Sequence, residues 1–256
     1  MNQFEKFKQL HQNPAPFLLG NIWDIKSAQV FEAGGYKAIG VSSQALSNAM
    51  GYEDGENLPF EVLHHLAKRV VEAVNIPFSV DMEAGYSRSI EGIINNIDQL
   101  HDVGVVGINL EDTIPGTPRS LQSVTDFQRI IAAVAEHVSR NNMQLFLNIR
   151  TDGFLLGMPN ALEETLSRVK IYEGTGADSI FVPCITAKAD IATVVSFTKL
   201  PVNVMCMPNL PGFNELSELG VKRISMGPFH FNKVYNTAAK LADEIILDQS
   251  FSSLFS

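Results

Sequence analysis

The chain has 256 residues, of which 45% are apolar and 18% charged, and its formal net charge is −9. This composition excludes a disordered chain, and the negative charge argues against nucleic acid and anionic membranes as partners. The sequence shows no apolar run long enough to span a membrane, no secretory signal and only two cysteines, so we expect a cytoplasmic protein with reduced thiols.

Short apolar segments alternate with amphipathic segments along the whole chain. The apolar segments predict eight strands, at residues 17–21, 38–42, 77–83, 105–111, 144–151, 178–183, 201–206 and 221–226. The amphipathic segments predict helices at residues 2–12, 25–33, 60–74, 90–103, 123–140, 161–174, 189–197 and 232–247. This order predicts an α/β fold, a single (β/α)8 TIM barrel domain over residues 1–256 with an extra C-terminal helix.

An open, doubly wound sheet is the alternative architecture. It usually has fewer strands and often carries a glycine-rich nucleotide turn after the first strand. The turn here is Asn21-Ile22-Trp23-Asp24, so the barrel is favoured. Two stretches, residues 45–58 and 113–119, contain glycine and read as loops; the first is longer than an ordinary connection, so we expect both to be functional.

Carboxylates follow the third and fourth predicted strands. Successive side chains of a strand alternate between faces, so Asp81 and Glu83 share one face, as do Asn109 and Glu111. The helix predicted at residues 90–103 allows the two strands to be parallel neighbours, which brings the three acids to the same edge. Such acids repel one another unless a cation lies among them, and oxygen ligands suit Mg²⁺ or Mn²⁺, so we predict a metal site.

Arg150 is the cation at the end of the fifth predicted strand. Its planar guanidinium suits a carboxylate or phosphonate ligand, but a structural salt bridge to Glu111 or Asp152 is the alternative. No histidine cluster resembles a zinc site, and Cys184 is expected to be a buried, inert thiol.

Several motifs together resemble the isocitrate lyase/phosphoenolpyruvate mutase superfamily. They are Asn21-Ile22-Trp23-Asp24, Gly40-Val41-Ser42-Ser43, Val80-Asp81-Met82-Glu83-Ala84-Gly85-Tyr86, Gly107-Ile108-Asn109-Leu110-Glu111-Asp112, Asn148-Ile149-Arg150-Thr151-Asp152 and Pro201-Val202-Asn203-Val204-Met205. The resemblance covers nearly the whole chain. It implies a (β/α)8 barrel that forms a homo-oligomer, usually a tetramer, in which the C-terminal helix is exchanged between subunits.

The resemblance also implies roles for individual residues. Asp81 would bind Mg²⁺ directly, while Asp54, Glu83 and Glu111 hold its water shell. Arg150 would grip the substrate and, with Glu111, take part in catalysis. The implied substrate-binding residues are Trp23, Ser42, Ser43, Gln44, Asp81, Arg150 and Asn203, and the implied gating loop contains Thr117 and Arg119. The ligand would be a small 2-oxo acid or a related dicarboxylate.

The gating loop departs from both patterns that are typical of the superfamily. The lyase motif Lys-Lys/Arg-Cys-Gly-His occurs nowhere, and the mutase motif Lys-x-Asn-Ser is replaced by Thr117-Pro118-Arg119-Ser120. Three hypotheses follow. The first is a Mg²⁺-dependent lyase or decarboxylase that cleaves a C–C bond of a 2-oxo or 2-hydroxy dicarboxylic acid through a pyruvate enolate. The second is a C–P bond enzyme, a phosphonopyruvate hydrolase or phosphoenolpyruvate mutase, and the third is a non-catalytic 2-oxo acid binder.

Overall fold

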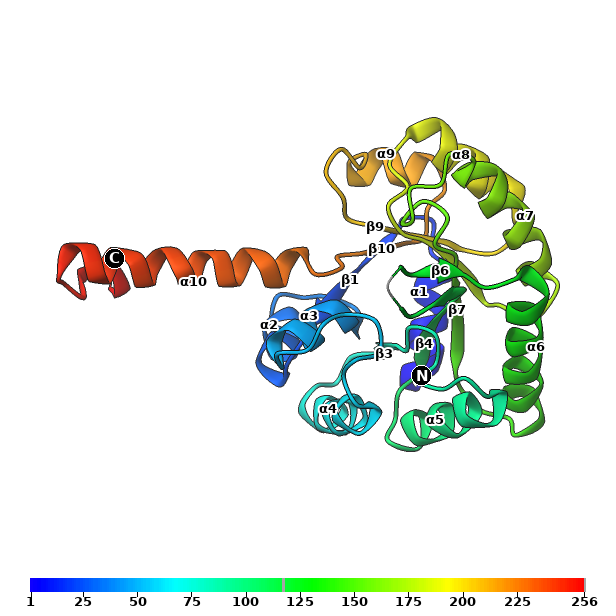
Figure 1. Cartoon of the computed structure of the whole chain (residues 1–256), viewed down its shortest axis with the longest axis horizontal. Coiled ribbons are helices and arrows are strands. Elements are labelled where there is room, and N and C mark those ends of the chain that lie inside the picture. The colour runs from blue at the N-terminus through cyan, green and yellow to red at the C-terminus, as the bar shows by residue number, and fades with distance from the viewer. Residues whose placement is uncertain (117, 256) are drawn as a thin grey trace.

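Eight parallel strands close into a barrel in this computed structural model, which describes residues 1–116 and 118–255 (Figure 1). Around the barrel the strands are β1 (Phe17–Ile22), β2 (Ile39–Val41), β3 (Phe78–Asp81), β4 (Gly107–Glu111), β7 (Phe146–Arg150), β8 (Ser179–Val182), β9 (Val202–Met205) and β10 (Arg223–Ser225). All eight predicted strands are present, each ending within two residues of its expected bounds. The predicted (β/α)8 barrel is therefore confirmed.

Ten α-helices accompany the strands in the described residues. They are α1 (Gln3–Gln12), α2 (Ile25–Ala33), α3 (Ser43–Ala49), α4 (Phe60–Ala73), α5 (Ile90–Asp102), α6 (Val124–Arg140), α7 (Ala161–Glu173), α8 (Lys188–Phe197), α9 (Phe213–Glu218) and α10 (Phe229–Asp248). Helices α2 to α9 lie between strands, whereas α1 precedes β1 and α10 follows β10. A short 3₁₀ helix, η1 (Ser252–Leu254), follows α10. Serine side chains cap two of the long helices: Ser89 accepts the Gly92 amide of α5, and Ser123 accepts the Asp126 amide of α6.

Five short elements were not expected from the sequence: α3, α9, η1, β5 (Thr113–Ile114) and β6 (Ser120–Leu121). Helices α3 and α9 were not expected, because seven- and six-residue helices give too little periodicity to be recognised. The segment after β4 was expected to be a loop, but its two ends pair as an antiparallel hairpin of β5 and β6. This hairpin stands beside the carboxyl end of β4.

Helix α1 closes the amino-terminal end of the barrel. Phe7 is fully buried there against Phe17, Leu19 and Phe146. Its ring also requires a glycine on β4, since a Cβ atom at Gly107 would lie 2.6 Å from Phe7 Cε1. The apolar plug therefore seals one end of the barrel and leaves the carboxyl ends of the strands as the open face.

The middle of the barrel is polar, although branched apolar side chains usually fill this position. Asn148 Nδ2 donates to Asn109 Oδ1 at 2.7 Å, and Ser179 Oγ donates to Asn148 Oδ1 at 2.6 Å. Asn203, which was expected to bind substrate, is fully buried in the same layer, where its amide donates to Ser225 Oγ at 3.1 Å. These hydrogen bonds fix the floor beneath the open face.

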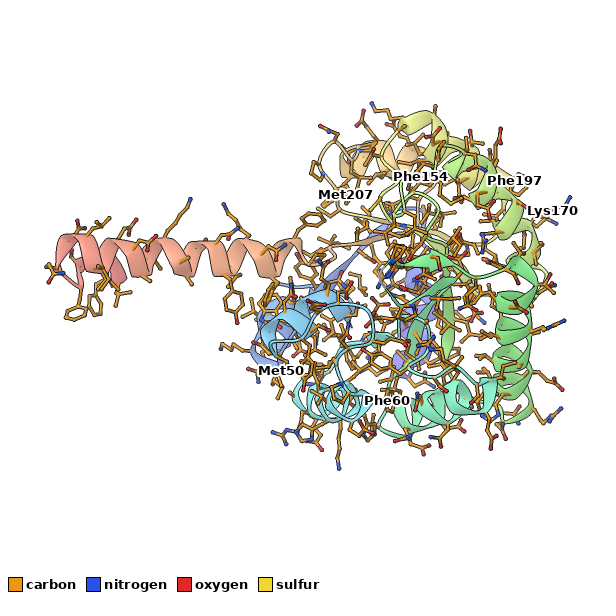
Figure 2. The ribbon with its side chains drawn as sticks, viewed as in Figure 1. Met50, Phe60, Phe154, Lys170, Phe197 and Met207 are labelled. Atoms are coloured by element: carbon orange, nitrogen blue, oxygen red, sulfur yellow. The ribbon has the colours of Figure 1, made fainter. Side chains whose placement is uncertain are left out.

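The last long helix, α10, projects away from the barrel (Figure 1). Figure 2 shows its side chains pointing away above and below the helix, and nearly all residues from Asn232 to Asp248 are exposed. Within the described residues, no helix is both long and apolar enough to cross a membrane.

Removal of the Phe7 ring should destabilise the barrel, because the close-packed plug cannot refill the space. We expect Phe7→Ala to lower the free energy of unfolding by about 3–5 kcal/mol in urea denaturation. Phe213→Ala, at a side chain that is 59% exposed, is the matched control and should change it by less than about 0.5 kcal/mol. Equal effects of the two substitutions would show that α1 is not a structural plug.

Candidate functional site

Asp81 and Glu111 are the last residues of β3 and β4, which are parallel neighbours as expected. The strand register places Asp81 beside Asn109, and Glu111 beside Arg150 on β7. Asp81 is held on both oxygens: Asn109 Nδ2 donates to Oδ1 at 3.4 Å, and Ser43 Oγ donates to Oδ2 at 2.9 Å. The carboxylate is therefore oriented from the barrel floor and from α3 at once.

Glu83 lies in the same region, but it does not belong to the strand on which it was predicted. Strand β3 ends at Asp81, so Glu83 lies beyond it, in a turn where its φ of 49° is left-handed. The expectation that Asp81 and Glu83 share one face of the same strand is therefore wrong. The turn nevertheless buries the Glu83 side chain, which accepts the Glu56 amide at 3.0 Å and the Tyr86 hydroxyl at 3.1 Å.

Arg150 makes the salt bridges that the sequence analysis gave as an alternative. Its Nε and Nη2 donate to the two oxygens of Asp152, at 2.6 and 3.0 Å, and its Nη1 lies 2.9 Å from Glu111 Oε2. Burial alone would lower the pKa of Arg150, but the charges of Asp152 and Glu111 raise it well above its ordinary value. The guanidinium is thus a permanently charged, fixed part of the site.

Arg119, on the β5–β6 connection, lies among the remaining carboxylates. Its Nη2 atom is 3.5 Å from Asp54 Oδ2, 3.5 Å from Glu83 Oε2 and 3.8 Å from Glu111 Oε1. These acids come from the loop before α4, the turn after β3 and the end of β4. Thr117, predicted in the same gating loop, lies outside the described residues.

Burial has the largest influence on the pKa of each of these acids. Loss of solvent, followed by the negative charges of Asp54 and Asp81, raises the pKa of Glu83 to about 8. Burial likewise raises the pKa of Glu111 above its ordinary value, although the Arg150 charge opposes this. Burial also raises the pKa of Asp54, despite its proximity to Arg119. Additional positive charge would therefore stabilise the ionised acids.

A cavity of about 90 Å³ lies at this face of the barrel. It is lined by seven predicted residues: Ser42, Ser43, Gln44, Asp54, Asp81, Arg119 and Arg150. It is also lined by residues that the sequence analysis did not select, among them Asn21, Phe181, Met205 and Ser225. Strand alternation was the signal that could have found Phe181 and Ser225, since each lies two positions from a polar inward residue.

Four other predicted residues of the described structure do not line the cavity: Glu83 and Glu111, whose contacts with Arg119 and Arg150 are given above, and Trp23 and Asn203. Trp23 is buried against Phe231 at the start of α10, with ring centroids 5.3 Å apart, and Asn203 belongs to the polar layer below. A larger hollow of about 520 Å³ lies at the amino-terminal end of the barrel, beside Lys8 and His11 of α1. It contains none of the clustered acids, so the smaller cavity is the candidate site.

The first residues of α3, Ser43 and Gln44, line the cavity together with Ser42. Ser42 is the N-cap, and its hydroxyl accepts the Ala45 amide at 3.3 Å. The first amides of a helix have no partner within that helix, and they carry partial positive charge that suits an anion. The segment from Ser42 to Gln44 lines the cavity, and that it binds a substrate carboxylate stays a prediction.

The donor set fits a hydrated magnesium ion. No three Asp, Glu, His or Cys side chains of residues 1–116 and 118–255 are close enough together to coordinate one ion directly. Mg²⁺ normally keeps several waters and takes one or two carboxylates, so this spacing suits Asp81 as a direct ligand and the other acids as water acceptors. Asp54 Oδ1 supports this arrangement, because it is buried without a hydrogen-bond partner in the described structure.

Comparisons with known proteins agree with this architecture. The family model described as phosphoenolpyruvate phosphomutase matches residues 7–246. An uncharacterised protein of Mycobacterium tuberculosis strain H37Rv is 31% identical over 92% of this chain and 87% of its own length. An oxaloacetate decarboxylase of Paraburkholderia xenovorans is 24% identical over 78% of this chain and 67% of its own.

A solved structure is also similar in sequence and fold. The crystal structure of a candidate phosphonomutase from Burkholderia cenocepacia J2315 is 34% identical, with a TM-score of 0.89, and covers 94% of this chain and 99% of that one. The family model spans far more than half of the sequence. The chain therefore belongs to the phosphoenolpyruvate phosphomutase family.

Proposed function

We propose that the protein is a Mg²⁺-dependent lyase or decarboxylase that cleaves a C–C bond of a small 2-oxo or 2-hydroxy dicarboxylic acid. The observation that carries the proposal is Asp81, whose two oxygens are held by Ser43 and Asn109 at the wall of a small cavity. Similarity to an oxaloacetate decarboxylase supports oxaloacetate as the first substrate to test. Bound Mg²⁺, or Mn²⁺, would act as a Lewis acid for the charge that develops on the substrate's C2 oxygen.

The residues of the chain would bind and orient the acid. The amides that begin α3, at Ser43 and Gln44, would receive the carboxylate next to C2. Arg150 contributes a fixed positive charge to the cavity wall, because Asp152 accepts hydrogen bonds from its Nε and Nη2 atoms. Such a preorganised charge stabilises a developing enolate without reorganisation during the reaction.

Cleavage of a C–P bond is a second candidate, and a specific finding favours it. The family model and the 34% identical structure carry phosphomutase and phosphonomutase descriptions. Arg119 and Arg150 line the cavity together, and guanidinium groups suit phosphonate oxygens as well as carboxylates.

Release of the 2-oxo product from a substrate panel, pyruvate or glyoxylate according to the substrate, distinguishes these candidates. The panel contains oxaloacetate, substituted malates, isocitrates and phosphonopyruvate, each with Mg²⁺ or with EDTA. We expect Mg²⁺-dependent release from one C–C substrate, and a loss of about 100-fold or more in Asp81→Asn, because a several-kcal/mol Lewis-acid contribution disappears. Asp102→Asn, at an exposed position near the end of α5, is the control and should retain activity.

The other outcomes have defined meanings. A change in the phosphorus NMR spectrum of phosphonopyruvate, with no turnover of the other acids, would establish the C–P candidate instead. Metal-dependent binding of a 2-oxo acid without any turnover in the panel would contradict the enzymatic proposal and leave a non-catalytic binder.

The pH dependence of stability reports on the buried acids. The pKa of Glu83 is about 8 in the folded chain against an ordinary 4.5, so its favourable contribution is complete below pH 4.5 and is lost as the pH rises through 8. In EDTA, we expect the Tm of the wild type to fall by several degrees from pH 5 to pH 8. Glu83→Gln should show a flatter curve, and Mg²⁺ should reduce the loss in the wild type.

Glu61→Gln, at an exposed position on α4, is the control for this measurement and should follow the wild-type curve. Parallel curves for Glu83→Gln and the wild type in EDTA would show that the Glu83 carboxylate is not destabilised by its surroundings.

We also propose that α10 packs against another copy of the chain. Helix α10 and the residues after it expose Tyr235, Ile246, Leu247, Phe251 and Phe255, a larger apolar surface than a single copy normally leaves in water. A homo-oligomer would cover this surface.

A charge-matched pair of variants tests the oligomer. We expect the wild type to elute as a dimer or larger assembly in size-exclusion chromatography with light scattering. The double substitution Ile246→Glu and Leu247→Glu should shift it to smaller species, because buried charge is costly. Lys240→Glu changes the net charge by the same amount at an exposed polar position and should not. A monomeric wild type would refute the assembly.

A further inference from the structure

Arg119 lies beside the same carboxylates that would accept hydrogen bonds from the water shell of a bound metal ion. Its Nη2 atom lies within 3.5–3.8 Å of carboxylate oxygens of Asp54, Glu83 and Glu111, which belong to three separate segments. Of these acids, Glu83 and Glu111 have side chains that are only 1% exposed. The guanidinium therefore already supplies positive charge to acids that burial disfavours in their ionised form.

The contacts of Arg119 are long, in contrast to those of Arg150. Charge-assisted N–H···O bonds are normally about 2.7–2.9 Å long, and the three Arg119 distances all exceed this range. In the described structure Arg119 makes ion pairs with these acids but no hydrogen bond to them, and its side chain is 20% exposed. Arg150 is held by three contacts of 3.0 Å or less. Arg119 is thus the more exchangeable cation of the cavity.

The space around Arg119 allows its guanidinium to approach both the acids and the cavity. It lines the same cavity as Asp81 and Arg150. It also lies against Gly55, where a Cβ atom would be 3.6 Å from Arg119 Nη2 and where the φ of 96° favours glycine. The loop before α4 therefore packs closely over the arginine without a side chain at this position.

We propose that Arg119 is an exchangeable counter-cation that determines substrate specificity. It shares Asp54, Glu83 and Glu111 with the hydrated divalent cation, and in the loaded site it pairs with the distal anionic group of the substrate. This proposal rests on the proposed function, and it assigns to Arg119 the recognition of the substrate's second negative group, carboxylate or phosphonate. Arg150 is less free to pair with that group, because Asp152 holds its Nε and Nη2 atoms and Glu111 holds its Nη1 atom.

The first test uses the metal alone, without substrate. If Arg119 and a divalent cation compete for the same carboxylates, Arg119→Gln should bind Mn²⁺ about tenfold more tightly than the wild type in electron paramagnetic resonance titrations. Arg119→Lys retains the charge and should remain near the wild type. Arg129→Gln removes an exposed arginine on α6, whose side chain is 70% exposed, and should have no effect.

The second test compares two inhibitors by calorimetry in the presence of Mg²⁺. Oxalate has no distal group, whereas difluorooxaloacetate has a distal carboxylate. Arg119→Gln should weaken binding of difluorooxaloacetate by about tenfold or more, because a charge-assisted contact is lost, and should leave oxalate affinity within about twofold. Arg119→Lys should recover part of the difference.

Failure of this proposal is distinguishable from failure of the proposed function. Unchanged Mn²⁺ affinity in Arg119→Gln, or an equal loss for both inhibitors, would overturn the role of Arg119 while metal-dependent oxalate binding still supports the enzyme. An absence of metal-dependent oxalate binding in the wild type would overturn the proposed function itself and, with it, the role of Arg119.

Discussion

The site depends on the cost of burying negative charge. Asp81, Glu83 and Glu111 are nearly inaccessible to water, and a buried carboxylate without compensation costs several kcal/mol. Arg150 and Arg119 compensate them, one with short fixed contacts and the other with longer ones. The position of each cation is therefore set by the acids, and the shape of the cavity follows from where the two guanidinium groups lie.

The fixed cation is itself held by a second buried network. Asp112 Oδ1 accepts the Asp152 amide at 3.0 Å, while Asp112 Oδ2 accepts from Arg168 Nη1 at 3.1 Å and from the Tyr172 hydroxyl at 3.0 Å. Asp152 in turn accepts hydrogen bonds from Nε and Nη2 of Arg150. Helix α7 thereby anchors the ends of β4 and β7 through side chains, and the charge that faces the cavity cannot turn away from it.

The sequence predicted the barrel because its signal is periodic. Alternation along β4 correctly placed Asn109 and Glu111 on the inner face, and the parallel order of β3 and β4 correctly brought Asp81 beside them. Glu83 escaped this reasoning, because a left-handed turn by a non-glycine residue leaves no periodic trace. The contacts of Arg119 escaped it too: they depend on how the β5–β6 hairpin and the loop before α4 meet, and loop geometry is not encoded in spacing.

The site contains more acids than arginines, and this imbalance explains why the proposed chemistry would require a metal. Five acids line the cavity or contact the residues that line it, namely Asp54, Asp81, Glu83, Glu111 and Asp152. Three guanidinium groups face them: Arg119 and Arg150 line the cavity, and Arg223 donates to Asn109, which also lines it. When all five acids are ionised, an anionic 2-oxo acid would meet a field of its own sign there. A divalent cation beside Asp81 would offset most of that excess, and it would release Arg119 from part of its share of the acids. The ion that polarises the substrate would then also reduce the repulsion between the acids and the substrate's negative charge. Substrate binding and catalysis would therefore both depend on the positive charge of that ion.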